Sequence, residues 1–478
     1  MKKLNLFDAT LIVAGSMIGS GIFIVSADMA RTVGGAGWLL LLWILAGVMT
    51  LLAALSYGEL AGMMPKAGGQ YTYLKEAYNP FVGFLYGWTL FTVIQCGTIA
   101  AVAVGFSKFV GVFFPALSEN NVLHDFGFLK ITGAQMLGIA MLAVLTFLNT
   151  KGIQYGKIIL RIFTSAKLIA LFGLIFLGLF FATDATIWQN NLHHFWNAET
   201  FSIDKNNHQV ISSSLSNLGL IMALGVGMVG SLFSSDAWNN VTFIAGEIEN
   251  PKKNIPRSLL IGVSIVTAIY ILANIAYLKL LPFFGSPNST SLKEMGIMFA
   301  PNDRVGVSAA NMLFGSIGTS IMALLIIIST FACNNNLILA GARVYQQMAM
   351  DNLFFEKMKN NNSKNVPAFA LWIQFVWCSI LCLSGKYGDL LDYVIFAVLI
   401  FYILTIVGVF ILRIKKPNAD RPYKTFGYPV LPAIYILMAL LICIDLLIMK
   451  PNYSYPGLAI VALGIPVYFV WKKLKSVN

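Results

Sequence analysis

Two long apolar stretches of the chain are interrupted by small and polar residues. The first contains GSMIGSG at residues 15–21, and the second contains three glycines followed by SLFSSDAWNN at residues 231–240. Glycine weakens a helix by about 1 kcal/mol relative to alanine, so both stretches are expected to unwind there. Unwound backbone offers free N–H and C=O groups, which can bind carboxylate and ammonium groups.

The first interruption also has a simpler explanation. Gly15 and Gly19 are four residues apart, which is typical of a helix-packing face. The matched interruption of the second stretch favours a binding site, because open backbone at membrane depth is tolerated only where it lines a protein cavity. Paired interrupted spans at corresponding positions are the best sequence indication of a transporter binding site.

The composition indicates that these stretches lie in a membrane. Of the 478 residues, 58% are hydrophobic and only 11% are charged, whereas about 25% of an average soluble protein is charged. Too few charges remain to cover a soluble protein of this length. The composition therefore argues against a soluble enzyme, a disulfide-rich secreted domain and a disordered chain.

Twelve apolar stretches are long enough to span a bilayer, which takes about 20 helical residues. We expect an all-α membrane protein in which spans 1 and 6 are the interrupted ones. The expected spans are residues 8–30, 37–62, 80–114, 131–149, 156–182, 214–248, 257–281, 307–340, 367–384, 388–412, 430–449 and 456–472.

The positive charge follows the connections between spans. The net charge is +12, with 32 Lys and Arg residues. Most of them, including Lys252, Lys253 and Arg413, fall on the side of the N-terminus if the spans alternate. Because cytoplasmic loops are enriched in Lys and Arg, we expect a plasma (inner) membrane protein with both termini in the cytoplasm. This distribution explains the charge without nucleic acid as a partner.

The other reactive residue types form no catalytic or metal-binding pattern in the sequence. The five cysteines lie in apolar stretches, the four histidines lie in polar connections, and neither a P-loop nor a nucleophile elbow is present. We therefore expect no enzyme activity, no cofactor, no metal site and no disulfide framework.

Four segments together resemble the amino acid–polyamine–organocation superfamily. They are GSMIGSGIF at residues 15–23, PKAGGQY at 65–71, FSSDAWN at 233–239 and EIENPKKNIPR at 247–257. Within the superfamily, the chain is most similar to the L-type amino acid transporters, because of FTSAKLIAL at 163–171 and NIAY at 274–277.

This resemblance implies a LeuT-like fold of 12 transmembrane helices, with a 5+5 inverted repeat and broken helices 1 and 6. We expect residues 1–182 to form the first repeat, 183–213 an extracellular loop, 214–412 the second repeat, and 413–478 helices 11 and 12 with a cytoplasmic tail. The implied function is sodium-independent transport of neutral amino acids by alternating access, often by exchange. A proton-coupled amino acid or polyamine symporter is the alternative.

The expected partners are a small-molecule amino acid and the lipid bilayer. Animal L-type transporters pair with a single-span glycoprotein through a cysteine in the loop between helices 3 and 4. Residues 115–130 contain no cysteine. We therefore expect no disulfide-linked heavy subunit.

The free amides at the first break form the expected carboxylate site. They belong to Gly19, Ser20 and Gly21, at the positive end of the second half of helix 1. Glycine also allows a ligand to approach the backbone closely. By resemblance, the substrate ammonium is accepted by the main-chain oxygens of Met17, Phe233 and Asp236.

The side chains near the second break have several expected roles. Phe233 is expected to be an aromatic gate over the substrate, with a plain core aromatic as the alternative. Asn239 is expected to bind substrate or Tyr277, or else to satisfy the broken backbone. Asp236 is expected to cap free amides at the break, and a substrate-ammonium contact is the less favoured alternative. Tyr277 is a further candidate for a polar substrate contact.

Lys167 lies in the middle of the fifth expected span, where a cation is costly and indicates function. In the transporters that the chain resembles, a lysine here fills the place of a bound sodium ion between helices 1 and 8. We expect its ammonium to meet carbonyls near Gly15 and polar groups near Ser329 or Asn334. A proton-coupled role and a partly hydrated interface lysine are the alternatives.

Further polar residues lie within or near the spans. Three successive asparagines at residues 334–336 must find polar partners in the eighth span, and they indicate a polar pocket or an inter-helix network. Four charged residues near the cytoplasmic side are interpreted as ion pairs of an inner gate or of loops, with solvated faces as the alternative. They are Glu59, Glu247, Glu249 and Arg343.

Overall fold

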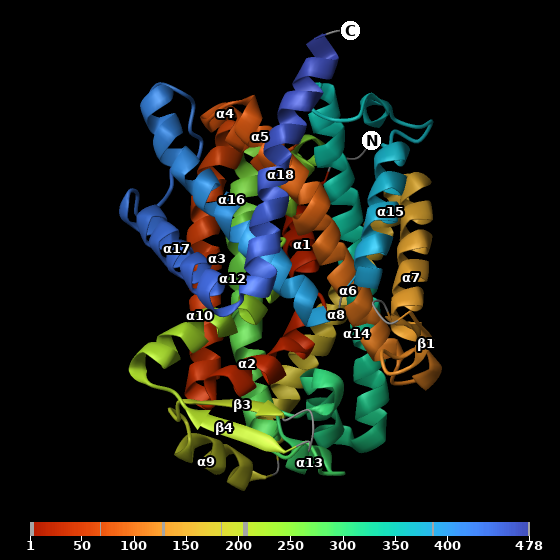
Figure 1. The fold of residues 1–478 in the computed structure, drawn as a ribbon, viewed down its shortest axis with the longest axis vertical. Helices are drawn as coiled ribbons and strands as arrows, with labels where there is room; N and C mark the ends of the chain where they lie inside the picture. Colours follow the sequence, from red (N-terminus) through yellow and green to blue (C-terminus); the bar gives the residue numbers. More distant parts are fainter. Residues whose placement is uncertain are drawn as a thin grey trace.

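The computed structural model describes residues 4–66, 68–126, 130–182, 184–203, 209–384 and 387–476, without the side chains of 153–163 and 474–476. Ala67 of the PKAGGQY motif and residue 183, where the extracellular loop is expected to begin, lie outside the described residues. The chain is mostly helical, as expected, and its long helices form one bundle (Figure 1).

The first half of the chain contains eight α-helices before the segment that begins at residue 184. They are α1 (Leu6–Met17), α2 (Val25–Val33), α3 (Ala36–Met63), α4 (Gln70–Ala77), α5 (Pro80–Thr89), α6 (Gln95–Val110), α7 (Gly133–Thr150) and α8 (Ile153–Phe180). Short helical turns are η1 (Gly21–Phe23), η2 (Leu90–Ile94) and η3 (Pro115–Leu117).

The second half contains the remaining helices. They are α9 (Ala185–His193), α10 (Asn217–Ser234), α11 (Asn240–Phe243), α12 (Pro251–Leu280), α13 (Leu292–Met295), α14 (Val305–Met350), α15 (Ala368–Ser384), α16 (Tyr387–Lys415), α17 (Val430–Met449) and α18 (Pro451–Ser476). The short turns are η4 (Ala245–Glu247), η5 (Pro301–Asp303) and η6 (Glu356–Lys359).

In the described part of the chain, nine helices are long and apolar enough to cross a membrane, or ten if the bent pair α8 and α9 is one span. The expected number of twelve is not confirmed. Helix α1 has 12 residues and α15 has 17, and both are shorter than the roughly 20 residues of an uninterrupted span. The chain is thus a multi-pass membrane protein.

The interruptions of the first and sixth expected spans are present. Helix α1 ends at Met17 and α2 begins at Val25, with η1 between them. Helix α10 ends at Ser234, and five non-helical residues precede the four-residue helix α11. Ala237 in this second break has φ of 62°, in the left-handed region that side chains disfavour.

Two short antiparallel hairpins depart from the all-α expectation. β1 (Val122–Asp125) pairs with β2 (Lys130–Thr132), and β3 (Glu199–Ile203) pairs with β4 (Val210–Ser214). Both lie in connections between helices. Pairing of the two strands satisfies backbone groups that a loop would leave to water.

Two expected spans contain local irregularities. The third runs from Pro80 to Val110, and a π-helical turn, η2, joins α5 to α6. The indole of Trp377 donates to the carbonyl of Thr92 in this turn, at 2.9 Å. The eighth lies within α14, which is kinked at Gly315, where φ is 59°.

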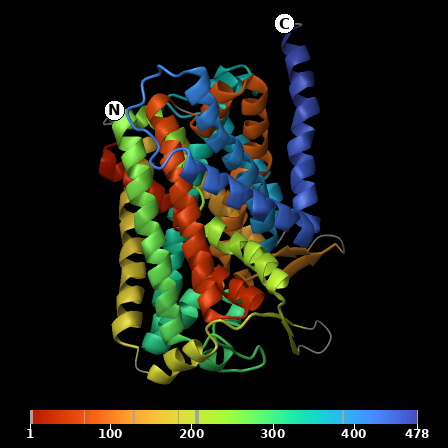
Figure 2. The ribbon, with the colours of Figure 1, turned by 90° about the vertical axis from the view of Figure 1, so that its left-hand side faces the viewer.

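The described ends of the chain lie at one end of the bundle, and both hairpins lie at the other (Figure 1). Helix α12 packs along α3 and α1, and α14 packs against α6 and α8. Helix α18 stands at the outside of the bundle (Figure 2). The two breaks are therefore surrounded by intact helices, and α12 and α14 are among those that contact them.

Candidate functional site

The two helix breaks are in contact with each other. A Cβ added to Gly21 would lie 2.9 Å from the Cβ of Ser234 and 2.1 Å from its Oγ. Because no side chain tolerates contacts that short, the first break can approach the end of α10 only with glycine at residue 21. Gly19 faces α14, where an added Cβ would lie 3.3 Å from Sγ of Cys333.

Tyr270 of α12 joins the two breaks. Its hydroxyl lies 3.0 Å from the carbonyl oxygen of Met17 and 2.9 Å from that of Ser234, the last residues of α1 and α10. Both carbonyls lack their helical donors because the helices end there. Sequence reasoning missed Tyr270, although it lies two helical turns before Tyr277 on the same face of α12.

Two further contacts along this face of α12 hold the second half of the first span. Ser26 donates to Oδ1 of Asn274 at 2.7 Å. Tyr277 donates to the carbonyl of Ile22 at 3.4 Å. Tyr277 therefore donates to the backbone of the first span and not to Asn239, one of its expected partners.

The expected carboxylate site is only partly available. The N–H of Gly19 already donates to the carbonyl of Met17 at 2.9 Å. Neither Ser20 nor Gly21 donates its N–H to a backbone carbonyl within the described part of the chain. These two amides remain the better carboxylate donors.

The expected ammonium acceptors are also partly engaged. The carbonyl of Met17 accepts from the N–H of Gly19 and shares the single proton of the Tyr270 hydroxyl with the carbonyl of Ser234. An ammonium can take the place of the Tyr270 hydroxyl at Met17 while that hydroxyl donates to Ser234. The carbonyl of Phe233 accepts from the N–H of Asp236 at 3.2 Å, and the N–H of Ser235, which is shared among three carbonyls, points to it as well.

Lys167 of α8 is buried against the first break, with a side chain only 1% exposed. Its ammonium donates to the carbonyls of Gly15 and Ile18, each at 2.7 Å. The expected contact with Gly15 is therefore present. Ser329 of α14 donates to the same Ile18 carbonyl at 3.3 Å, so the first break is held from two sides.

The asparagine expected near Lys167 lies elsewhere. The amide nitrogen of Asn334 points to the sulfur of Met141, at 4.0 Å. On this face of α14, Cys333 instead donates to the carbonyl of Ser16 at 3.1 Å. The polar groups that α14 brings to the first break thus come from Ser329 and Cys333.

Phe233 is buried beside Tyr387, the first residue of α16. The two rings meet edge to face, with centroids 6.1 Å apart, and the Tyr387 hydroxyl lies 3.1 Å from Oγ of Ser20. Tyr387 also lines two cavities of about 600 Å³ and 220 Å³ near the hairpin end of the bundle. Sequence reasoning did not identify Tyr387, which contacts residues of both broken spans and also lines these cavities.

Asp236 lies buried in the second break and accepts a hydrogen bond from the hydroxyl of Tyr402, at 2.5 Å. The carboxylate also accepts from the backbone N–H of Ala237, so the expected contact with a free amide of the break is present. Asp236 is not the N-cap residue of α11, because that position is Asn239.

Asn239 contacts α4, which sequence reasoning did not foresee. Its amide nitrogen donates to Oε1 of Gln70 at 3.0 Å, and Nε2 of Gln70 donates to Thr405 at 3.0 Å. Gln70 begins α4 directly after Gly69, whose φ is 43°. The PKAGGQY motif thus brings a buried amide to the second break.

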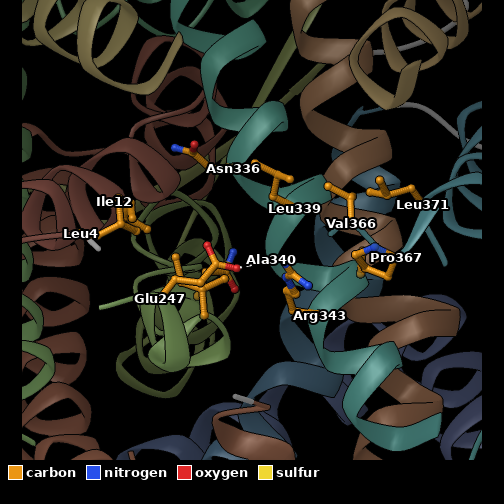
Figure 3. A pocket seen from close by; sticks show the side chains of 13 residues that line it. Leu4, Ile12, Glu247, Asn336, Leu339, Ala340, Arg343, Val366, Pro367 and Leu371 are labelled. Carbon is orange, nitrogen blue, oxygen red and sulfur yellow. Dashed lines mark ion pairs between the residues drawn. The ribbon is translucent and has the colours of Figure 1, made fainter. Parts of the chain in front are cut away.

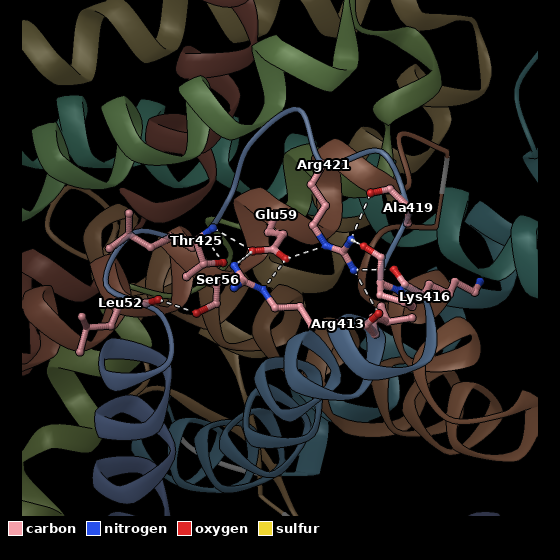
Figure 4. A network of polar contacts seen from close by, with 11 residues as sticks. Leu52, Ser56, Glu59, Arg413, Lys416, Ala419, Arg421 and Thr425 are labelled. Carbon is pink, nitrogen blue, oxygen red and sulfur yellow. Dashed lines mark hydrogen bonds and ion pairs between the residues drawn. The ribbon is translucent and has the colours of Figure 1, made fainter.

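Glu59 is the centre of a buried ion cluster near the end that carries the chain termini (Figure 4). Its carboxylate is 1% exposed and accepts from Arg413 at 2.6 and 2.9 Å, from Arg421 at 3.2 Å, and from the N–H of Thr425 at 2.8 Å. This cluster ties α3 to the end of α16 and to the segment that follows it. The interpretation as an ion pair is confirmed for Glu59.

Glu247 and Arg343 form a second ion pair, at 2.9 Å, between η4 and α14 (Figure 3). Burial raises the pKa of the Glu247 carboxyl, and the nearby Arg343 guanidinium partly opposes that rise. The ion-pair interpretation is confirmed for these two residues as well.

Comparison with known proteins places this arrangement in a family. Residues 4–470 match the family model described as amino acid permease. The chain belongs to the amino acid permease family. The resemblance to the amino acid–polyamine–organocation superfamily is therefore confirmed, and the chain is a membrane transporter of amino acids and not an enzyme.

Individual relatives cover nearly the whole permease. The serine/threonine exchanger SteT of Bacillus subtilis is 30% identical, over 99% of this chain and 98% of that protein. The b(0,+)-type amino acid transporter 1 of Mus musculus is 26% identical, over 98% and 88%. The large neutral amino acids transporter small subunit 2 of Mus musculus is 28% identical, over 98% and 81%.

The Tyr270 hydroxyl is expected to stabilise the permease. Substitution Tyr270→Phe leaves the carbonyl of Ser234 without this donor and should lower the free energy of unfolding by about 1–3 kcal/mol. The control is Tyr277→Phe, whose hydroxyl is a longer 3.4 Å from its acceptor and should cost less than about 1 kcal/mol. Unfolding in detergent measures both, and equal losses would contradict the bridge.

The Glu59 cluster gives a second prediction. Glu59→Gln keeps the shape but leaves Arg421, which is 8% exposed, without its carboxylate, at a cost of about 3 kcal/mol. In the control Glu76→Gln, the pair with Lys416 is exposed on both sides, and the expected loss is below about 1 kcal/mol. Unfolding in detergent measures both variants. If Glu59→Gln lowers the free energy of unfolding no more than Glu76→Gln does, the Glu59 cluster does not stabilise the permease as proposed.

Proposed function

We propose that this permease exchanges neutral amino acids across the plasma (inner) membrane by alternating access and without sodium. Membership of the amino acid permease family supports the substrate class. The relative named as a serine/threonine exchanger and the relatives named as neutral amino acid transporters support neutral substrates, and the former supports exchange.

We propose a LeuT-like architecture with inverted repeats at residues 1–182 and 214–412. The breaks in the first and sixth expected spans support it, because they occupy matched positions in the two repeats. Both termini are proposed to be cytoplasmic. The common position of the described chain ends in Figure 1 supports this topology, as does the distribution of Lys and Arg.

The substrate is proposed to bind between the two breaks. Its carboxylate accepts from the amides of Ser20 and Gly21, and its ammonium is bound by the carbonyls of Phe233 and, after rearrangement, Met17. Gly19, which has no side chain, allows α14 to pack closely against the first break. These groups bind the part common to all amino acids, so that other side chains around the site select the substrate.

The side chains around the breaks then have distinct roles. Phe233 is proposed as the gate, since it lies under Tyr387 on the side of the two large cavities. Tyr277 orients the second half of the first span. Asn239 and Asp236 stabilise the second break through Gln70 and Tyr402.

Lys167 carries the proposal of sodium independence. Its fixed ammonium donates to two carbonyls of the first break, and Ser329 of α14 shares one of them. Backbone carbonyls and hydroxyls are the ligands that bind sodium in transporters with broken helices. A fixed positive charge at this place therefore makes a diffusible one unnecessary.

No disulfide-linked heavy subunit is proposed. All five cysteines are buried and free. The name of one relative contains the words small subunit, but a buried thiol cannot reach a partner chain without opening the bundle. The permease is proposed to act without a covalent partner.

Proton-coupled symport of an amino acid or a polyamine is the second candidate. The observation in its favour is Asp236, a buried carboxylate at the second break whose contacts are the hydroxyl of Tyr402 and the N–H of Ala237 and not a cation. A carboxylate in this position can take up a proton. A pH gradient would drive accumulation in that case, but not in strict exchange.

Counterflow in liposomes tests the proposed function. Liposomes that contain the purified permease are loaded with unlabelled L-serine, L-threonine, L-leucine, L-lysine or spermidine, and the same solute in labelled form is added outside. The external salt is sodium or potassium, and each measurement is made with and without a pH gradient. We expect exchange of neutral amino acids, equal in both salts. Uptake only with sodium would overturn sodium independence, and failure of every amino acid would overturn the function.

Lys167→Ala is expected to reduce counterflow at least tenfold, because two carbonyls lose charge-assisted hydrogen bonds worth about 1.5–3 kcal/mol each. The matched control is Lys279→Ala, which removes a lysine that also donates to a backbone carbonyl, that of Leu179, away from both breaks. The control should retain most of the activity. Unchanged counterflow and unchanged sodium response in Lys167→Ala would refute the role.

A further inference from the structure

A separate cavity of about 60 Å³ lies among α1, α11, α14 and α15 (Figure 3). Leu4, the first described residue, is part of its lining, so the cavity is at the end of the bundle that carries the chain ends. Each water molecule needs about 10–15 Å³ measured in this way. The cavity is thus large enough for a cluster of several small polar groups.

Two buried amide groups line this cavity from different helices. Asn240 of α11 is 2% exposed and Asn336 of α14 is 8% exposed. Within the described part of the chain, the Nδ2 atom of each has no hydrogen-bond partner. Buried donors without acceptors are costly, and two of them at one cavity favour an acceptor group such as a carboxylate as its ligand.

The same cavity is also lined by the ion pair of Glu247 and Arg343. Arg343 has two further acceptors, Oε1 of Gln346 at 3.0 Å and the carbonyl of Asn365 at 3.3 Å. Its charge is therefore shared among several oxygens. The Glu247 carboxylate has four lone-pair positions and can accept a further donor. The lining of the cavity thus includes both amide donors and a carboxylate acceptor.

This combination suits a zwitterion better than a simple anion. The amides of Asn240 and Asn336 can donate to a carboxylate, while Glu247 can accept from an ammonium. The remaining lining is largely apolar, including Ile12 and Leu371, and suits a short uncharged side chain.

We propose that this cavity, which we name the inner subsite, binds an amino acid substrate at the end of the permease that carries the chain termini. Asn240 follows Asn239 directly, so α11 joins the second helix break to the inner subsite. An amino acid that leaves the breaks toward this end passes the inner subsite. The proposal rests on the proposed transport of amino acids and adds a second place of recognition on one side only.

One-sided transport kinetics test the inner subsite. Liposomes with uniformly oriented permease, selected through a C-terminal tag, are used to measure KM for L-serine separately on each side. In Asn336→Asp, the donor is replaced by a carboxylate that repels the substrate carboxylate. We expect KM on the side of the termini to rise at least tenfold, with KM on the opposite side within twofold of the unsubstituted value.

Asn335→Asp is the matched control. Asn335 is adjacent, fully buried, and also has no partner for its amide atoms within the described residues, yet it does not line the cavity. In Asn335→Asp, the ratio of the KM values for L-serine on the two sides of the membrane should be the same as in the unsubstituted protein. Asn240→Ala, on another helix, should reproduce the one-sided increase and replaces Asn336→Asp if that variant fails to fold.

The outcomes separate the two proposals. Unchanged KM on the side of the termini in both Asn336→Asp and Asn240→Ala, or an equal change on both sides, overturns the inner subsite while the proposed function stands. An equal one-sided change in Asn335→Asp also overturns it. Absence of counterflow by the unsubstituted permease for every amino acid overturns the proposed function itself.

Discussion

The structure depends on how the backbone of two interrupted helices is satisfied inside an apolar bundle. A carbonyl without a donor is costly in this environment, and each break exposes several. Tyr270 reaches the last carbonyls of α1 and α10, and Lys167 reaches two carbonyls of the first break. Because these donors belong to intact helices, the breaks are as well positioned as the helices around them. A site made of backbone needs this support to keep its shape.

Charges within the bundle are neutralised in three different ways. Lys167 is matched by main-chain dipoles, Asp236 by a tyrosine hydroxyl, and Glu59 by two guanidinium groups. The first two leave an ionisable group at a helix break, where it can respond to a ligand or to a rearrangement of the helices. The Glu59 cluster instead joins α3 to the end of α16, away from the breaks. Position along the bundle thus decides whether a buried charge contacts a helix break or joins intact helices.

The breaks and the lysine contact could be predicted from the sequence because their signals are local. Glycine and serine clusters lower helix stability where they stand, and a lysine within an apolar stretch needs acceptors nearby. The partners of Asn239 and Asp236 could not be predicted in this way. Gln70 and Tyr402 are ordinary residues of their own helices, and only the packing of α4 and α16 brings them to the second break.

The sequence by itself determined the membrane environment, the interruptions of two spans, the family and the contact of Lys167 with the first break, since composition and motif spacing are properties of the chain. Tertiary structure decided which donors satisfy the breaks, that Tyr387 contacts Ser20 and Phe233 and lines the large cavities, and that two amide groups without partners in the described part of the chain line one cavity. Each of these depends on residues from separate helices, such as Ser20 and Tyr387 or Asn240 and Asn336. Helix packing brings such pairs together, and no local pattern in the sequence encodes it.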